Sequence, residues 1–329
     1  MRTTGDCAPR SNLKEVSAMP TSESPGPATT HVRILMGAYN GLPWLEAQLA
    51  SFLEQSHGNW SLWVSDDGST DGTREALVRF ADRHPGRVAR ILDGPRRGSA
   101  ANFLHLLCHP DLPPGIVALS DQDDVWMPNK LQAAVSRLQE SPDAPCAWSA
   151  RYLFVDEDLR GDQASPLWPR RPSLGNAVVQ NILSGHTLTL NPAALELVRR
   201  AGIRPVPHHD WWIYLLLTAT GGRVMVDPAI VLRYRQHGAN VMGASAGRRA
   251  RRLRTAALMD GTLRDWVSAN LRALEESEVP LTDAARRLTD QWAGAGRWQR
   301  LRLLRKFGIH RQSRAQTASI YLAALLGKL

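Results

Sequence analysis

The feature of the sequence that most restricts the fold is a regular alternation of short apolar runs and helical patterns between residues 31 and 138. The apolar runs are HVRILMGAYNG, WSLWVSDDGSTDG, RVARILDGP and GIVALSDQDD. Each run is typical of a short buried strand, and apolar residues at helical spacing follow it. This alternation predicts an α/β fold, in which a mainly parallel, Rossmann-like sheet carries helices on both faces.

Three of the predicted strands end in short polar segments. The segments are Ala38, Tyr39 and Asn40 after the first strand, Asp66 and Asp67 after the second, and residues 121–124 after the fourth. Open α/β sheets bind ligands beyond the carboxyl ends of their strands. We therefore expect the three segments to share one site.

Segment 121–124 is the most acidic of the three, with Asp121, Asp123 and Asp124 in four residues. One interpretation is a solvated loop, in which Asp124 caps the helix that Pro128 helps to start. The other is a cation site, because Mg²⁺ and Mn²⁺ prefer oxygen ligands and Mg²⁺ commonly joins carboxylates to substrate phosphates. The convergence of polar segments on one edge favours the second interpretation.

The second half of the chain is less regular. The pattern predicts strands in CAWSARYLFVDED and ILSGHTLTLNP, and a helix in HHDWWIYLLLTATGG that ends at a glycine pair. In RVMVDPAIVLRYRQHGAN it predicts a strand, a turn broken by proline and another strand. From about Ser245 onward the pattern is helical, arginine-rich and amphipathic.

Charge and composition predict three regions: a disordered leader at 1–30, a folded body at 31–243 and a basic helical region at 244–329. The chain has a net charge of +9, and from Ser245 to Leu329 it holds 17 Lys or Arg against 7 Asp or Glu. Such a region indicates an anionic partner. We predict that it docks on an anionic membrane surface; the alternative is that its helices pack on the body or form a dimer.

The sequence contains no apolar run of about 20 residues, the length that a membrane-spanning helix needs. Three cysteines without metal-ligand spacing fit a reduced compartment. Together these features predict a cytoplasmic protein that lies peripherally on the inner face of the plasma membrane.

Six motifs in the order AYNG, SDDGSTDGT, SDQDDVWMPNKL, SGHTLTLN, HDWW and YRQHGANV resemble the family 2 glycosyltransferases of the GT-A fold. The resemblance covers about residues 32–243. The last two motifs, with the DQDDVW form, are most similar to rhamnosyltransferase-like members that build bacterial cell-surface polysaccharide.

By this resemblance, the DQD segment is the DxD motif of the family. Asp123 would ligate Mg²⁺ or Mn²⁺, and Asp121 would contact the ribose or, through water, the metal. His237 would be a third metal ligand, although it also fits a hydrogen-bonded loop histidine. Arg235 would close over the diphosphate.

The resemblance also makes Asp66 and Asp67 the base-binding pair. A carboxylate accepts from the N3–H of uracil or thymine, which favours a UDP or dTDP donor; a turn in DDGSTDG is compatible with that role. The remaining donor-binding residues are Ala38, Tyr39 and Asn40, which flank the base, and Ser184 and Gly185, which leave room for the sugar.

Asp210 matches the general base of the family, at the start of the helix in HHDWW. The alternative is an ordinary helix cap. A single base without a nucleophilic carboxylate implies one in-line displacement with inversion at the anomeric carbon. Of Trp211 and Trp212, one would form a platform for the acceptor sugar, and the other would be buried.

The predicted function is a metal-dependent, inverting transfer of a sugar, L-rhamnose from dTDP-rhamnose being one candidate, to a glycan or lipid-linked glycan. A sugar-phosphate nucleotidyltransferase is the first alternative, but GAYNGLPWL lacks the basic glycine-rich loop expected of it. A nucleic-acid-binding protein is the second, but no recognition motif accompanies the basic region, so we expect no nucleic-acid partner.

Overall fold

The computed structural model describes residues 30–238, 256, 258 and 260–329. The predicted leader, the boundary near residue 243 and the basic cluster GRRARRLR lie outside these ranges, except for Thr30. Across the described residues, no helix combines the length and the apolar character that crossing a membrane requires.

The described strands form one nine-stranded sheet with the order β3-β2-β1-β4-β8-β6-β9-β5, and β7 pairs with β6. Their bounds are β1 Val32–Ala38, β2 Trp60–Asp66, β3 Val88–Asp93, β4 Ile116–Ser120, β5 Val125–Trp126, β6 Cys146–Val155, β7 Gln163–Ala164, β8 Thr189–Leu190 and β9 Arg223–Arg235. The four strands predicted between residues 31 and 120 are all present and mutually parallel. Beyond β4 the sheet is mixed, since β8 is antiparallel to β4 and to β6.

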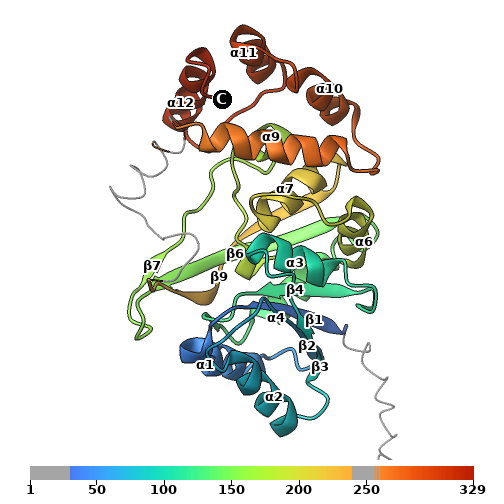
Figure 1. The fold of residues 1–329 in the computed structure, drawn as a ribbon, viewed down its shortest axis with the longest axis vertical. Coiled ribbons are helices and arrows are strands. Elements are labelled where there is room, and N and C mark those ends of the chain that lie inside the picture. Colours follow the sequence, from blue (N-terminus) through green and yellow to red (C-terminus); the bar gives the residue numbers. More distant parts are fainter. Residues whose placement is uncertain (1–29, 239–255, 257, 259) are drawn as a thin grey trace, which may run out of the picture.

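Helices cover both faces of the sheet, as predicted (Figure 1). On one face lie α1 Leu42–Leu53, α2 Thr73–Arg83 and α4 Lys130–Leu138; on the other lie α3 Ser99–Leu107, α6 Pro192–Ala201 and α7 His209–Ala219. The side chains of β1 alternate between the two layers, because Ile34 and Met36 belong to the first core and Leu35 to the second. Two short elements, α5 Leu174–Ala177 and the 3₁₀ turn η1 Gly185–Thr187, complete the body.

Among the described residues after 260, four helices lie at the end of the molecule opposite α1 and α2 (Figure 1). They are α9 Thr262–Glu275, α10 Asp283–Trp292, α11 Arg297–Lys306 and α12 Arg314–Leu325. Their predicted helical character is confirmed. Val267 and Leu271 of α9 share a core with α7, so much of the apolar surface in this region packs on the body rather than facing outward.

Two predictions about the second half are wrong. Segment 223–235 is one strand, not two, because Pro228 lies at a register irregularity: Ala150 pairs with Asp227 and Arg151 pairs with Ile230. Pro228 has no N–H to donate to the neighbouring strand, and the register irregularity lets the strand continue past it. In ILSGHTLTLNP only Thr189–Leu190 pairs as a strand, and η1 precedes it.

Candidate active site

The ends of β1 and β4 are joined by the side chain of Gln122. Its Nε2 donates to the carbonyl of Tyr39 at 2.7 Å, and the backbone N–H of Tyr39 donates to its Oε1 at 2.8 Å. Gly41 permits this contact, because a Cβ at that position would lie 2.1 Å from the Gln122 side chain. The middle residue of the DQD segment therefore ties two predicted ligand loops together, a role that the sequence did not indicate.

The loops after β1 and β2 are also joined. Asn40, at a φ of 49°, accepts through Oδ1 from the N–H of Thr70 at 2.8 Å. Asp66 is buried, and its Oδ1 accepts from the N–H and the hydroxyl of Ser69 at 2.9 and 2.6 Å. The predicted turn in DDGSTDG is thus confirmed, and Asp66 stabilises it.

Asp67 extends this cluster to the loop after β3. Its carboxylate accepts from the N–H of Arg96 at 2.6 Å and from the N–H of Gly98 at 2.9 Å. The Tyr39 side chain is 58% exposed, so its ring faces solvent at this edge. The residues predicted to bind the nucleotide base therefore come together at the carboxyl ends of β1, β2 and β3.

The acidic segment is joined by a histidine that the sequence analysis did not single out. His186 Nδ1 lies 3.4 Å from Asp124 Oδ2 and 3.6 Å from Asp121 Oδ2. These three residues offer ligand atoms that all lie within 4.8 Å of one another. The only sequence signal for His186 was its place in the SGHT motif, and a lone histidine there is not specific.

The prediction that Asp124 caps the following helix is wrong. The N-cap of α4 is Asn129, and no side chain caps this helix. Asp124 is instead fully buried, and it accepts from the backbone N–H of Arg235 at 3.3 Å. It belongs to the acidic cluster because the end of β9 and the η1 turn enclose it.

Asp123 faces the other predicted ligand, His237. The Nε2 of His237 lies 2.8 Å from Asp123 Oδ2, and the imidazole stacks on Trp44 with ring centroids 3.7 Å apart. The structure thus brings together two residues that are 114 positions apart in sequence. Arg235, predicted to close over the diphosphate, is buried and donates to the carbonyls of Asp123 and Glu157, so in this structure it supports the acidic loop.

Lys130 places a buried positive group beneath the cluster. Its Nζ donates to the carbonyl of His186 at 2.6 Å and lies 3.2 Å from the centroid of the Trp126 ring. Burial lowers the pKa of Lys130 well below its usual value, while the carboxylates of Asp124 and Asp121 act in the opposite direction. A buried lysine of this kind follows from tertiary contacts that the sequence pattern does not reveal.

Burial also sets the protonation of the acidic residues. Burial, helped by the nearby carboxylates of Asp123 and Asp121 and opposed by His186, raises the pKa of Asp124 to about 8. Burial alone would lower the pKa of His186, but Asp124 and Asp121 outweigh it and raise this pKa. The cluster therefore holds protons that a bound cation would displace.

The donor set fits a small divalent cation. Asp123 Oδ1 and Asp124 Oδ2 are buried and have no hydrogen-bond partner among the described residues. Buried polar atoms without partners are costly, and coordination removes that cost. Carboxylate oxygens suit Mg²⁺ and Mn²⁺, and an imidazole beside them makes the set less typical of Mg²⁺.

We expect the affinity for Mn²⁺ to rise with pH. The cation binds the ionised carboxylate, so below the Asp124 pKa of about 8 each pH unit should strengthen binding about tenfold per displaced proton. Calorimetric titration at pH 6, 7, 8 and 9 measures this slope, which should level off above pH 8. Asp124→Asn should flatten it, and an affinity in the wild type that is constant from pH 6 to 8 contradicts the assignment.

Asp210 lies in the first turn of α7 and faces the same turn that carries His186. Its Oδ2 accepts from the backbone N–H of Gly185 at 3.1 Å. His208, not Asp210, is the N-cap residue of this helix, although Asp210 Oδ1 accepts from the backbone N–H of Trp211 in its first turn at 2.7 Å. The η1 turn therefore contacts Asp210 through the N–H of Gly185 and the acidic cluster through His186.

Gly185 is required by packing. A Cβ there would lie 2.6 Å from Nε2 of His209, whose ring stacks on Phe103 with centroids 4.1 Å apart. Its predicted role in leaving room for the donor sugar stays a prediction. The expected acceptor platform is wrong, since Trp211 and Trp212 are both buried and Trp211 donates to the carbonyl of Ala177 at 2.6 Å.

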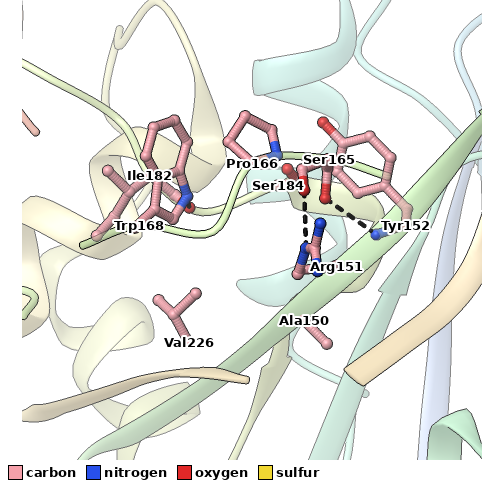
Figure 2. A pocket seen from close by; sticks show the side chains of 9 residues that line it. All are labelled: Ala150, Arg151, Tyr152, Ser165, Pro166, Trp168, Ile182, Ser184 and Val226. Atoms are coloured by element: carbon pink, nitrogen blue, oxygen red, sulfur yellow. Dashed lines mark hydrogen bonds between the residues drawn. The ribbon is translucent and has the colours of Figure 1, made fainter. Parts of the chain in front are cut away.

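A small pocket adjoins Ser184, with Tyr152 on one side and Trp168 and Ile182 on the other (Figure 2). Its volume of about 30 Å³ suits roughly two water molecules rather than a sugar ring. Ser165 closes it, since its carbonyl accepts from Arg151 Nε at 2.7 Å. This pocket therefore extends the site beside Ser184 but does not by itself form an acceptor groove.

Comparison with known proteins identifies a family for part of the chain. Residues 33–194 match the family described as glycosyl transferase family 2. The chain carries a family 2 glycosyltransferase domain. The matched region contains the loops after β1, β2 and β3, the acidic segment and His186, whereas Asp210 and His237 follow it in the sequence.

Two curated relatives and one solved structure are similar to this glycosyltransferase. The dTDP-rhamnosyl transferase RfbG of Shigella flexneri is 24% identical over 260 residues, which are 73% of this chain and 85% of that protein. The UDP-Glc:alpha-D-GlcNAc-diphosphoundecaprenol beta-1,3-glucosyltransferase WfgD of Escherichia coli is 32% identical over 107 residues, which are 32% of this chain and 40% of that protein.

The solved structure is the mannosyltransferase PcManGT from Pyrobaculum calidifontis in complex with GDP-Man and Mn²⁺. It aligns with a TM-score of 0.52 at 21% identity and covers 92% of this chain and 86% of its own. This similarity concerns the fold alone. The predicted GT-A architecture with a helical C-terminal region is confirmed.

Proposed function

We propose that this protein transfers a sugar from a nucleotide sugar to a glycan or lipid-linked glycan, with inversion and with the help of Mg²⁺ or Mn²⁺. The observation that carries the proposal is the position of η1, residues 185–187. Its first N–H binds Asp210, and its His186 binds the acidic residues at the end of β4. A group on the acceptor side and a group on the diphosphate side are thereby held by one three-residue turn.

The nucleotide would lie over the ends of β1, β2 and β3. Asp66 and Asp67 are held there by Ser69, Arg96 and Gly98. A carboxylate in this position accepts from the N3–H of uracil or thymine, which favours UDP or dTDP over a guanine nucleotide. The name of RfbG, a dTDP-rhamnosyl transferase, supports dTDP-rhamnose as the first donor to test.

The diphosphate would lie at the acidic cluster, with Asp121, Asp123 and His237 as the proposed metal ligands. Asp124 and His186 are further candidates, because they share the cluster of ligand atoms with Asp121. A bound dication supplies a Lewis acid for the departing diphosphate. The protein residues keep this region buried, and Lys130 and Arg235 hold its backbone in place.

Asp210 would accept the proton of the attacking hydroxyl. The N–H of Gly185 fixes one carboxylate oxygen, which aims the group toward the loop beside Ser184. With one base and no nucleophilic carboxylate, the acceptor hydroxyl attacks the anomeric carbon in a single displacement, from the face opposite the diphosphate. A β-linked dTDP-L-rhamnose would then give an α-linked product.

The acceptor would be a growing polysaccharide, free or attached to lipid. WfgD is named for an acceptor in which GlcNAc is linked to diphosphoundecaprenol, and that similarity supports a lipid-linked acceptor. A lipid-linked acceptor would place the reaction at a membrane surface.

We expect nucleoside diphosphate to be released only when nucleotide sugar, divalent metal and glycan acceptor are all present. A panel of UDP-, dTDP- and GDP-sugars with and without Mn²⁺ measures this release and identifies the donor. Binding of UDP- or dTDP-sugars should exceed that of GDP-sugars. Formation of pyrophosphate from a nucleoside triphosphate and a sugar phosphate would instead identify a nucleotidyltransferase and exclude the proposal.

A further inference from the structure

The solvent-facing side of α12 is apolar along its length. No charged side chain lies between Arg314 and Lys328. The exposed residues between them are all without polar side chains: Ala315, Ala318, Leu322, Leu325, Leu326 and Gly327. The opposite side, with Ile320, Ala323 and Ala324, is buried in the core. A helix that is apolar on its outer side as well as its inner side usually contacts a second apolar phase.

Helix α11 adds an exposed aromatic residue, Trp298, close to the C-terminal end of α12. Trp298 is 60% exposed, and Leu322, Leu325 and Leu326 are 55%, 40% and 52% exposed. The two helices pack together, and Arg300 of α11 donates to the carbonyl of Leu329, just beyond α12. The start of α11, which carries Trp298, therefore meets the end of α12, where the exposed leucines lie.

Basic residues are frequent in the part of the sequence that carries these apolar residues, and acidic ones are absent from it. Residues 291–329 contain eight Lys or Arg and no Asp or Glu. Six of the basic residues are exposed: Arg297, Arg302, Arg305, Lys306, Arg314 and Lys328. Together with Trp298, Leu322, Leu325 and Leu326 they are named here the α11–α12 surface.

We propose that the α11–α12 surface binds an anionic lipid bilayer. Leucine and tryptophan side chains enter the boundary between headgroups and acyl chains, while arginine and lysine meet the anionic headgroups. A second copy of this chain fits poorly, because it would bring two surfaces of the same positive charge together. Nucleic acid would leave the exposed leucines in water.

The remainder of the basic region contributes less to this contact. The apolar sides of α9 and α10 are committed to the protein core, through residues such as Val267, Leu271 and Leu288. Membrane contact is thus confined, among the described residues, to the last two helices. Docking does not depend on the transferase activity; only the conclusion that it brings the enzyme to a lipid-linked acceptor rests on the proposed function.

Flotation of the full chain with vesicles tests the proposal. Vesicles of phosphatidylcholine with about 30% phosphatidylglycerol should bind the protein, neutral phosphatidylcholine vesicles should not, and high salt should weaken binding. Leu322→Ser with Leu325→Ser should weaken partitioning about tenfold. The matched control is Leu167→Ser with Ile203→Ser, which changes residues that are 60% and 56% exposed elsewhere.

The charge contribution has its own pair of variants. Arg302→Glu with Arg305→Glu should weaken binding to anionic vesicles, whereas Arg79→Glu on the exposed side of α2 should not. Circular dichroism melting checks that each variant is folded. Equal binding to neutral and anionic vesicles, or full binding by both α11–α12 variants, overturns the proposal, as does a dimer that these variants dissociate without any vesicle binding. These assays contain no donor or acceptor, so their failure is distinct from failure of the transferase assignment.

Discussion

Asp210→Asn should reduce sugar transfer by about 10²–10⁴-fold, the usual cost of removing a general base, while the donor and the metal still bind. The amide has nearly the same shape as the carboxylate, and its oxygen can accept from one of the two backbone N–H groups, those of Gly185 and Trp211, that hold the two carboxylate oxygens. It cannot accept the proton of the acceptor hydroxyl at neutral pH. Steady-state rates with a calorimetric measurement of donor affinity separate these two effects.

The matched control for this variant is Asp283→Asn. Asp283 also lies in the first turn of a helix, α10, but its side chain is 90% exposed. We expect this variant to retain full activity. If Asp210→Asn mainly lowers donor affinity, Asp210 belongs to the nucleotide site, and if it keeps the wild-type rate, Asp210 is not the base.

Much of the fold follows from the sequence because its first half obeys local rules. Short apolar strands, each followed by an amphipathic helix, favour parallel pairing, and the ends of such strands share an edge. Asp66, Asp67, Asp121 and Asp123 could be placed at that edge from their positions after the strands alone. The turn that Asp66 stabilises was equally local, since its partner Ser69 is three residues away.

The residues that the sequence did not reveal depend on distant contacts. Lys130 and His186 are 56 positions apart, and they meet only because η1 lies against the end of β4. A lysine after an acidic segment is ordinarily solvated, so nothing in the local pattern predicts that it is buried. The interpretation of Asp124 as a helix cap failed for the same reason. Its burial depends on the end of β9, which is 111 positions away in the sequence, and the local pattern does not report that contact.

The misplacement of the acceptor platform has a different physical cause. Tryptophans at the start of a helix often face a site, but α7 is covered on several sides by α3, α6 and α9. Both Trp211 and Trp212 are consequently buried. The number of neighbours around a helix depends on how the C-terminal region folds back, and periodicity within the helix does not report it.

Asp123→Asn should lower the transfer rate by about 10³-fold or more, since a metal ion contributes several kcal/mol to stabilising the transition state. The amide keeps the size of the side chain and can still accept a hydrogen bond from Nε2 of His237. In the wild-type structure this nitrogen lies 2.8 Å from Asp123 Oδ2. We therefore expect a folded protein with weakened Mn²⁺ affinity, measured by calorimetry beside the transfer assay. Asp111→Asn is the control, because this exposed residue precedes β4 and lies at the opposite end of that strand from Asp123.

The same measurement distinguishes the two sets of ligand atoms around the acidic segment. Asp123 faces His237, whereas Asp121 and Asp124 face His186. If Asp123→Asn weakens Mn²⁺ binding and Asp124→Asn changes mainly its pH dependence, Asp123 is a direct ligand and Asp124 tunes the charge of the cluster. If Asp123→Asn binds Mn²⁺ and transfers sugar like the wild type, the metal assignment of Asp123 is wrong, and the His186 side of the cluster becomes the site to test.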